Sequence, residues 1–155
     1  MIRYNKKRKD CAMKISTKGR YGWRILLDLA LHDGENPRLI KEVAESQQIS
    51  EKYISRLILP LIEAGFVESL RGAKGGLRLS TPPKEITLLD VVEAMEGTVS
   101  VVECVVDKSF CPKSDDCSAC KMWSGLNKKI RKAMAEITLK DVLKSEKKRR
   151  NRLSV

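Results

Sequence analysis

Residues 40–80, "IKEVAESQQISEKYISRLILPLIEAGFVESLRGAKGGLRLS", contain the pattern that decides the fold. The first part predicts a short helix at 39–47, after which "QIS" turns the chain. Ser50 is expected to be the N-cap of a second helix, because its hydroxyl can accept a hydrogen bond from a free backbone N–H. The apolar side chains of this helix recur at i, i+3, i+4, i+7 and i+8: Ile54, Leu57, Ile58, Leu61 and Ile62. Two short helices joined by a tight turn, the second amphipathic, predict a helix-turn-helix.

The residues that follow predict a β-hairpin, since strands at 66–70 and 77–80 flank a turn that contains three glycines. A hairpin directly after a recognition helix is a wing. Arg71, Lys74 and Arg78 surround this turn. Because glycine lets the backbone approach closely, one of these cations can enter a narrow minor groove.

The outer face of the second helix carries candidate DNA contacts. The apolar stripe leaves Lys52, Ser55 and Arg56 on other faces of the helix. Lysine and arginine suit phosphate and the O6 and N7 atoms of guanine, and serine can bond either a base or a phosphate. An ordinary solvated helix face is the alternative, and the basic wing shifts the balance towards DNA binding.

The chain as a whole is strongly basic. Its 155 residues contain 31 Lys and Arg against 20 Asp and Glu, a formal net charge of +11 that indicates a polyanionic partner such as nucleic acid. Part of the excess lies in "RYNKKRKD" near the start and "KSEKKRRNR" near the end, which are expected to be solvated, disordered tails. No signal peptide and no apolar run of about 18–20 residues are visible, so a cytoplasmic protein with no membrane partner is expected.

Four cysteines lie close together, at Cys104, Cys111, Cys117 and Cys120, with six, five and two residues between neighbours. Because thiols stay reduced in the cytosol, these cysteines point to metal or redox chemistry more than to disulfides. Structural zinc sites usually pair two short knuckles, and only Cys117 and Cys120 form one here. An iron–sulfur cluster accepts looser spacing and four thiolates, so it is the favoured interpretation, with zinc and disulfides as alternatives. Cys11 is given no role.

Helices are predicted on both sides of these motifs. One spans about residues 16–32, and another begins at a cap formed by Thr87 and Asp90 and stops at Gly97. After the cysteines, apolar residues at three- and four-residue steps predict a helix with a seam-like face: Trp123, Leu126, Ile130, Met134 and Ile137. No Ser/His/Asp set, paired-carboxylate site or P-loop is visible, and with one histidine the usual general base is nearly absent, so the chain is predicted not to be an enzyme.

Several of these stretches together resemble one family. "STKGRYGWRILLDLAL", the segment 40–80, and "ITLLDVVEAMEG" followed by "ECV" are similar to the Rrf-type winged-helix transcriptional regulators, the IscR, NsrR and RirA-like iron–sulfur regulators. The likeness covers about residues 13–143. It implies a mostly α fold with a small β-hairpin wing, in which a winged helix-turn-helix domain is followed by a long C-terminal dimerisation helix. It also implies a homodimer in which these long helices cross and which binds an imperfectly palindromic operator in double-stranded DNA.

The resemblance further implies site residues. Three family cysteines that ligate an iron–sulfur cluster match Cys104, Cys111 and Cys117, and Cys120 stands where the fourth ligand is often a histidine. A 2Fe–2S cluster is expected by this analogy, with 4Fe–4S as the alternative. The family's contacts to the major groove, minor groove and backbone of DNA fall on Ser50, Lys52, Tyr53, Arg56, Arg71 and Gly72.

The sequence also departs from the family pattern. Gln48 replaces the glycine usual in the turn, and Ala73 and Lys74 replace Pro-Gly in the wing. Relatives of the NsrR type use a carboxylate from the partner's first helix, where this chain has Arg20.

The expected organisation follows the motifs. It comprises a basic extension at 1–12, the winged domain at 13–97, a cluster-binding segment at 98–122, a dimerisation helix region at 123–144 and a basic tail at 145–155. The predicted function is a DNA-binding transcriptional regulator whose DNA affinity or specificity is switched by the cluster, in response to iron, cluster demand, redox state or nitric oxide. The alternatives are a cluster-free family regulator of cysteine metabolism controlled by a partner protein, and an iron–sulfur electron carrier.

Overall fold

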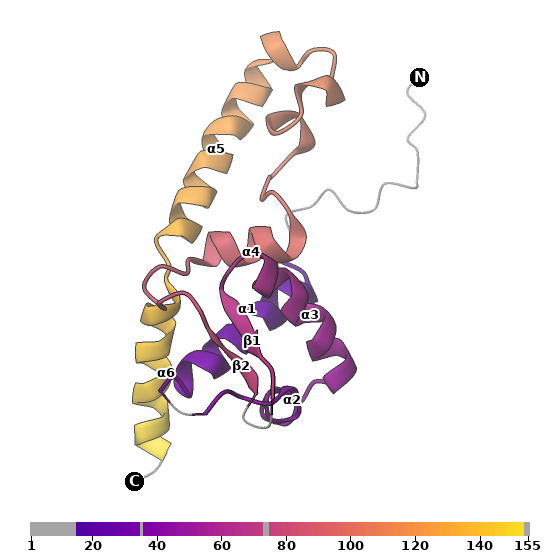
Figure 1. Cartoon of the computed structure of the whole chain (residues 1–155). Coiled ribbons are helices and arrows are strands. Elements are labelled where there is room, and N and C mark those ends of the chain that lie inside the picture. The colour runs from indigo at the N-terminus through magenta and orange to yellow at the C-terminus, as the bar shows by residue number, and fades with distance from the viewer. Residues whose placement is uncertain (1–14, 35, 73–74, 154–155) are drawn as a thin grey trace.

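The computed structural model of the chain describes residues 15–34, 36–72 and 75–153 (Figure 1). The predicted extension at 1–12, Cys11 and the candidate DNA contact Lys74 lie outside these residues. Helices and strands follow in the order α1 (Thr17–Leu31), α2 (Ile40–Gln47), α3 (Glu51–Glu63), β1 (Val67–Leu70), β2 (Gly76–Leu79), α4 (Leu88–Glu96), the 3₁₀ helices η1 (Glu103–Val105), η2 (Lys108–Phe110) and η3 (Ser114–Asp116), α5 (Ser118–Ala135) and α6 (Leu139–Leu153). The predicted fold class, mostly helical with a two-stranded wing, is confirmed.

Helices α2 and α3 form the predicted helix-turn-helix. Ser50 caps α3, and its hydroxyl accepts a hydrogen bond from the amide of Tyr53 at 3.3 Å. The apolar stripe of α3 faces the core, where Ile54 and Leu61 are fully buried. Gln48 closes α2 in the left-handed conformation, with φ of 56°. The turn therefore keeps a geometry that usually requires glycine.

The wing is an antiparallel hairpin in which Val67 pairs with Leu79 and Leu70 with Gly76. Alternation along the strands buries Val67 and Leu77 against the helices. Leu77 also exchanges two backbone hydrogen bonds with Arg38, at 2.9 and 2.7 Å. Because Arg38 lies just before α2, these bonds attach the wing to the helix-turn-helix.

The core forms around α1, which lies between α2, α3, α4 and α6 (Figure 1). Its central residues, Ile25 and Leu26, are fully buried. Helix α4 approaches α1 so closely that a Cβ atom on Gly22 would lie 2.9 Å from the side chain of Met95. Glycine at this position therefore allows the close packing of the two helices.

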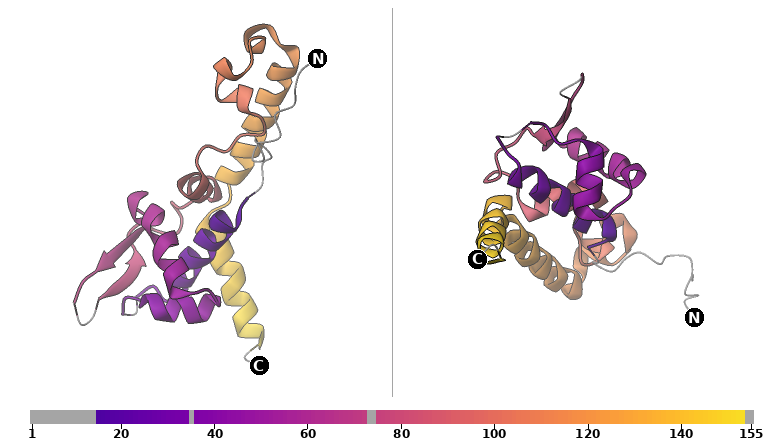
Figure 2. Two further views of the ribbon diagram at one scale, coloured as in Figure 1. Left: turned by 90° about the vertical axis from the view of Figure 1, so that its right-hand side faces the viewer. Right: turned by 90° about the horizontal axis from the view of Figure 1, so that it is seen from below.

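The segment of 3₁₀ helices leads away from this core, α5 runs back to it from the far end, and α6 continues along α1 (Figures 1 and 2). Helix α5 begins at Ser118, five residues before the predicted start, so Cys120 lies in its first turn. The seam residue Ile137 lies beyond its end, where its carbonyl accepts a hydrogen bond from the amide of Leu88 at 2.9 Å. No helix in the described ranges is long and apolar enough to cross a membrane.

The expected disordered tail at the C-terminus is wrong for residues 145–153, which belong to α6. The cap of α6 is reciprocal: Asp141 Oδ2 accepts from the amide of Thr138 at 3.1 Å, and the Thr138 hydroxyl accepts from the amide of Asp141 at 3.3 Å. Leu139 is fully buried and Leu143 packs on the main core. Anchoring by these residues outweighs the low hydrophobicity of the rest of the helix.

Candidate functional site

The outer face of α3 presents the predicted polar residues. Lys52, Ser55 and Arg56 are exposed, on turns whose opposite side is buried in the core. The hydroxyl of Ser55 donates to the carbonyl of Glu51 at 2.8 Å, which leaves its lone pairs directed to solvent. This face therefore offers two cations and a hydroxyl at the start of an exposed helix, a composition suited to a DNA groove.

Tyr53 is half-buried and packs on α1. Its ring meets the ring of Tyr21 edge-to-face, with centroids 6.0 Å apart and an interplanar angle of 83°. The guanidinium of Arg24 lies 5.2 Å from the centre of the Tyr21 ring and donates to the Gln47 carbonyl at 2.6 Å. Arg24 thus binds the end of α2 and supports the turn before α3. Sequence reasoning missed it, because nothing near it in the chain marks this contact.

The exposed end of the wing carries Arg71 and Gly72. Gly72 has φ of 104°, and its carbonyl accepts from the amide of Gly75 at 2.9 Å. Arg78 lies on β2, where it pairs with Glu68 of the opposite strand at 2.6 Å. Arg71 is therefore the described wing cation best placed to reach a ligand, and Arg78 is engaged within the sheet.

A buried carboxylate beneath the helix-turn-helix was not predicted. Asp28 of α1 is 1% exposed. It accepts hydrogen bonds from the Ser46 hydroxyl, from Gln47 Nε2 at 3.2 Å and from Arg38 Nη2 at 3.3 Å. These bonds join α1 to both ends of α2. In the sequence, Asp28 is an acidic residue among the apolar residues of a predicted helix, and this was the one feature that could have indicated a buried carboxylate.

The four cysteines lie in a segment of short 3₁₀ turns that leads into α5. All four are half-buried free thiols. The Cys120 thiol donates to the carbonyl of Cys104 at 3.5 Å, so these two residues are in contact. Cys117 is the N-cap residue of α5, and Cys111 lies between η2 and η3. In the ranges that the structure describes, no three His, Cys, Asp or Glu side chains are grouped so that they could hold a metal ion.

The electrostatics of these thiols connect three of them. Partial burial raises the pKa of Cys104, and the nearby Cys120 and Cys111 sulfurs raise it further because adjacent thiolates would repel one another. A cation would remove that repulsion. By donor chemistry the set fits an iron–sulfur cluster, which takes four thiolates, although Cys111 and Cys117 would have to move towards the other two.

Polar contacts link the cysteine segment to α4 and α5. Arg131 of α5 binds both carboxylate oxygens of Glu93 of α4, and Glu93 also accepts from the amide of Val99 at 3.0 Å. Burial would raise the pKa of Glu93, but the bonds from Arg131 and Val99 outweigh it and lower the pKa. Asn127, which is buried on α5, accepts from the amide of Val101 at 3.1 Å. The segment that precedes Cys104 is therefore held to both helices.

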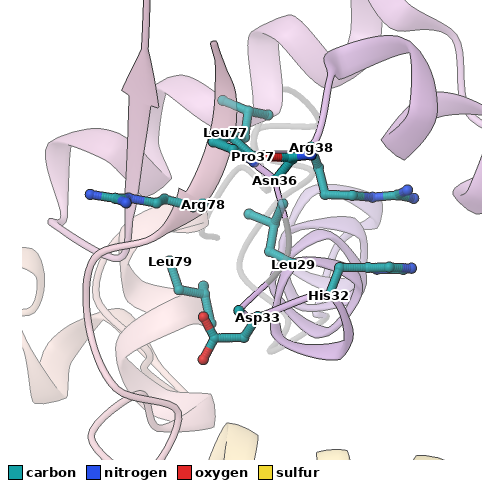
Figure 3. Close-up of a pocket in the computed structure, with 10 residues that line it drawn as sticks. Leu29, His32, Asp33, Asn36, Pro37, Arg38, Leu77, Arg78 and Leu79 are labelled. Carbon is teal, nitrogen blue, oxygen red and sulfur yellow. The ribbon is translucent and has the colours of Figure 1, made fainter. Parts of the chain in front are cut away.

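A pocket of about 310 Å³ lies under the wing (Figure 3). His32 and Arg38 extend to one side of it and Arg78 to the other, while Asp33 points away from all three. His32 Nδ1 lies 2.9 Å from the carbonyl oxygen of Asp28, within its own helix end. Because the polar groups do not converge on a common point, this pocket is not a candidate catalytic or metal site.

Comparisons with known proteins agree on one group. The family model described as Rrf2, iron-dependent transcriptional regulator, matches residues 15–145. Protein rrf2 of Nitratidesulfovibrio vulgaris is 38% identical over 132 residues, 85% of this chain and 88% of that protein.

Two solved structures are similar along most of the chain. That of CymR, the global cysteine regulator of B. subtilis, has a TM-score of 0.69 and 36% identity, over 85% of this chain and 97% of that one. The structure of T. potens IscR has a TM-score of 0.65 and 38% identity, over 86% of this chain and 88% of that one.

Proposed function

The chain belongs to the Rrf2 family of transcriptional regulators, and we propose that it binds DNA with an affinity controlled by an iron–sulfur cluster on residues 104–120. The observation that carries this proposal is that four half-buried free thiols lie on one short segment, which runs from η1 to the first turn of α5. Cys104, Cys111, Cys117 and Cys120 would hold the cluster, of the 2Fe–2S type. A bound cluster supplies a centre that responds to oxidants, nitric oxide or iron supply by changing its charge or its ligands.

The segment can transmit a change to the winged domain through its existing contacts. The amides of Val99 and Val101 donate hydrogen bonds to Glu93 of α4 and Asn127 of α5. A rearrangement of the cysteines would therefore shift the junction between these two helices. In a dimer joined by α5, that junction sets the spacing of the two recognition helices. A cluster then changes DNA affinity only as far as it favours one arrangement over another.

The proposed DNA surface combines the start of α3 with the wing. Lys52, Ser55 and Arg56 are exposed there, and Arg71 and Gly72 lie at the wing turn. Ser50 and Tyr53, which cap and support α3, complete the set together with Lys74, which lies outside the described residues. We assign the cations to phosphates and guanine edges in a palindromic operator, and the protein to the cytoplasm.

A second candidate is a cluster-free regulator controlled by a partner protein. Two observations favour it. Among the cysteines that the structure describes, only Cys104 and Cys120 are in contact, and Val106 and Phe110 expose apolar surface on the same segment. Similarity to CymR, a cysteine regulator, is as extensive as similarity to IscR. An electron carrier does not fit this family, whose members are transcriptional regulators.

The test is purification without oxygen, followed by absorption spectroscopy and assay of iron and sulfide. Brown protein with about two irons and two sulfides per chain supports the cluster. DNA binding is then compared between the loaded protein, the apoprotein and Cys111→Ala. A colourless, iron-free protein that still discriminates its own promoters from unrelated DNA contradicts the cluster and supports the partner-controlled regulator.

A further inference from the structure

Helix α6 concentrates positive charge. Its 15 residues contain seven Lys and Arg against two acids, Asp141 and Glu146. Its apolar residues Leu139 and Leu143 face the core, so the cations are left on the other faces. In the described ranges, three exposed cations of the last two turns make no ion pair or hydrogen bond with any acid: Lys147, Lys148 and Arg152.

The end of α6 lies beside the helix-turn-helix. A pocket of about 270 Å³ is lined by Arg24 of α1 and by Ser46 and Gln47 at the end of α2, and its far wall is formed by Arg149 and Arg150 of α6. Glu146 accepts from Arg149 Nη2 at 2.7 Å and from Arg150 Nε at 3.3 Å. The side of α6 that lines this pocket is therefore internally paired, and the helix is held in place by its packing along α1.

The C-terminal end of α6 lies at the same end of the molecule as the proposed DNA surface. In Figure 1 the C-terminal end of α6 lies at the lower end of the molecule, where α2 and the turn-side ends of β1 and β2 also lie. The view from below in Figure 2 looks onto these elements together, with α6 on the opposite side of α1 from α3. Helix α5 and the cysteine segment lead to the other end of the molecule.

We propose that the last two turns of α6 form a further DNA contact, in which Lys147, Lys148 and Arg152 bind backbone phosphates beyond those reached by α3 and the wing. This inference rests on the proposed DNA binding and adds a surface to it. Exposed cations on a helix fixed beside α2 meet phosphates without regard to base sequence. The contact therefore strengthens binding to any duplex and leaves base preference unchanged.

The experiment compares the full-length wild type with the triple variant Lys147→Gln, Lys148→Gln and Arg152→Gln. Binding to a mixed-sequence duplex of about 40 base pairs, several helical turns, is measured by fluorescence anisotropy at several salt concentrations. Each lost phosphate contact lowers the slope of log K against log salt by about 0.9, so the expected loss is about 2–3 per chain. Affinity for this duplex should fall at least about tenfold at the lowest salt.

The matched control removes the same charge from α5, with Lys121→Gln, Lys128→Gln and Lys129→Gln. These lysines are exposed on the helix that leads away from the proposed DNA surface. The control should keep the wild-type slope, and circular dichroism and sedimentation should show that both variants keep their helix content and assembly state. If the α6 variant has the slope of the control, the α6 contact is overturned and the proposed function stands. If the wild type binds no duplex at all, both are overturned.

Discussion

At the scale of single residues, Gln48 adopts an unfavourable backbone conformation within the helix-turn-helix. It is the one non-glycine residue with positive φ in the described ranges, and it lies in the turn between α2 and α3. The left-handed conformation costs an L-residue about 1–2 kcal/mol. No hydrogen bond from its side chain is present in the described part of the chain to offset this cost.

Replacing Gln48 with glycine should therefore stabilise the protein. The relief of backbone strain exceeds the entropy that glycine loses on folding, so we expect a gain of about 0.5–1 kcal/mol in the free energy of unfolding. Urea denaturation followed by circular dichroism measures this gain. Gln48→Ala is the control, since it removes the same side chain but keeps the strain, and it should give no increase. A glycine variant less stable than wild type would contradict the strain.

Asp28 is a second residue at which a single substitution should change the stability of the fold. Its carboxylate accepts from three side chains on or before α2 and is almost fully buried. Asp28→Asn should destabilise the fold by about 1–3 kcal/mol, because an amide has one acceptor oxygen and turns an N–H group towards donors. The free energy of unfolding in urea measures the loss. Glu42→Gln removes a long, half-exposed pairing with Arg38 and should change stability by less than about 0.5 kcal/mol. Equal effects of the two changes would argue against the network.

At the scale of elements, α6 depends on paired charges as well as on apolar anchors. The hydrogen bond from Arg149, supported by Arg150, lowers the pKa of Glu146 from 4.5 to about 2. Since the folded-state pKa is depressed, the stabilisation is fully present above about pH 4.5 and is lost as the pH falls towards 2.

The Glu146 carboxyl should accordingly titrate near pH 2, which carbon-detected NMR of the side chain can follow. In the double variant Arg149→Gln and Arg150→Gln the pKa should return towards 4.5, because both donors and both charges are removed. A wild-type titration near 4.5 would mean that the arginines do not hold Glu146 in solution, and that the end of α6 is not organised by this pair.

At the scale of the whole molecule, α5 leaves apolar surface exposed. Met122 is 58% exposed and Leu126 42%, and Trp123 lies beside them at 36%. These residues stand on the helix that leads away from the core, and they include the first part of the seam predicted from sequence. An apolar stripe of this kind on one helix face is typical of a surface that pairs with a second helix.

We expect Leu126→Glu to disrupt a homodimer. A buried carboxylate without a partner should weaken association by about 2–3 kcal/mol, or roughly 30- to 150-fold in the dissociation constant. Analytical ultracentrifugation over a range of concentrations measures this change. Lys128→Glu, on a different face of α5, is the control and should leave the dimer intact. Dissociation of both variants alike, or of neither, would remove α5 as the dimer surface.

The local patterns of the sequence determined the elements of the winged domain. Ser50, Thr87 and the glycines of the wing act through residues two to four positions away, and the apolar stripe of α3 is a property of one helix. Such signals do not depend on the rest of the chain, so the helix-turn-helix and the wing were correctly predicted. The exposed residues of α3 and the wing followed directly, since they are what the stripe leaves uncovered.

Only the tertiary structure decided which distant residues meet. Asp28 binds partners 10 to 19 positions away, Glu93 binds Arg131 38 positions away, and Leu139 orders a charged helix by burying itself in a core built mainly from the first hundred residues. Which cysteines touch is decided in the same way, because α5 starts earlier than its apolar pattern indicates and places Cys120 against Cys104. Contacts of this kind depend on how helices pack against one another, and that packing is a property of the assembled core and not of any single segment.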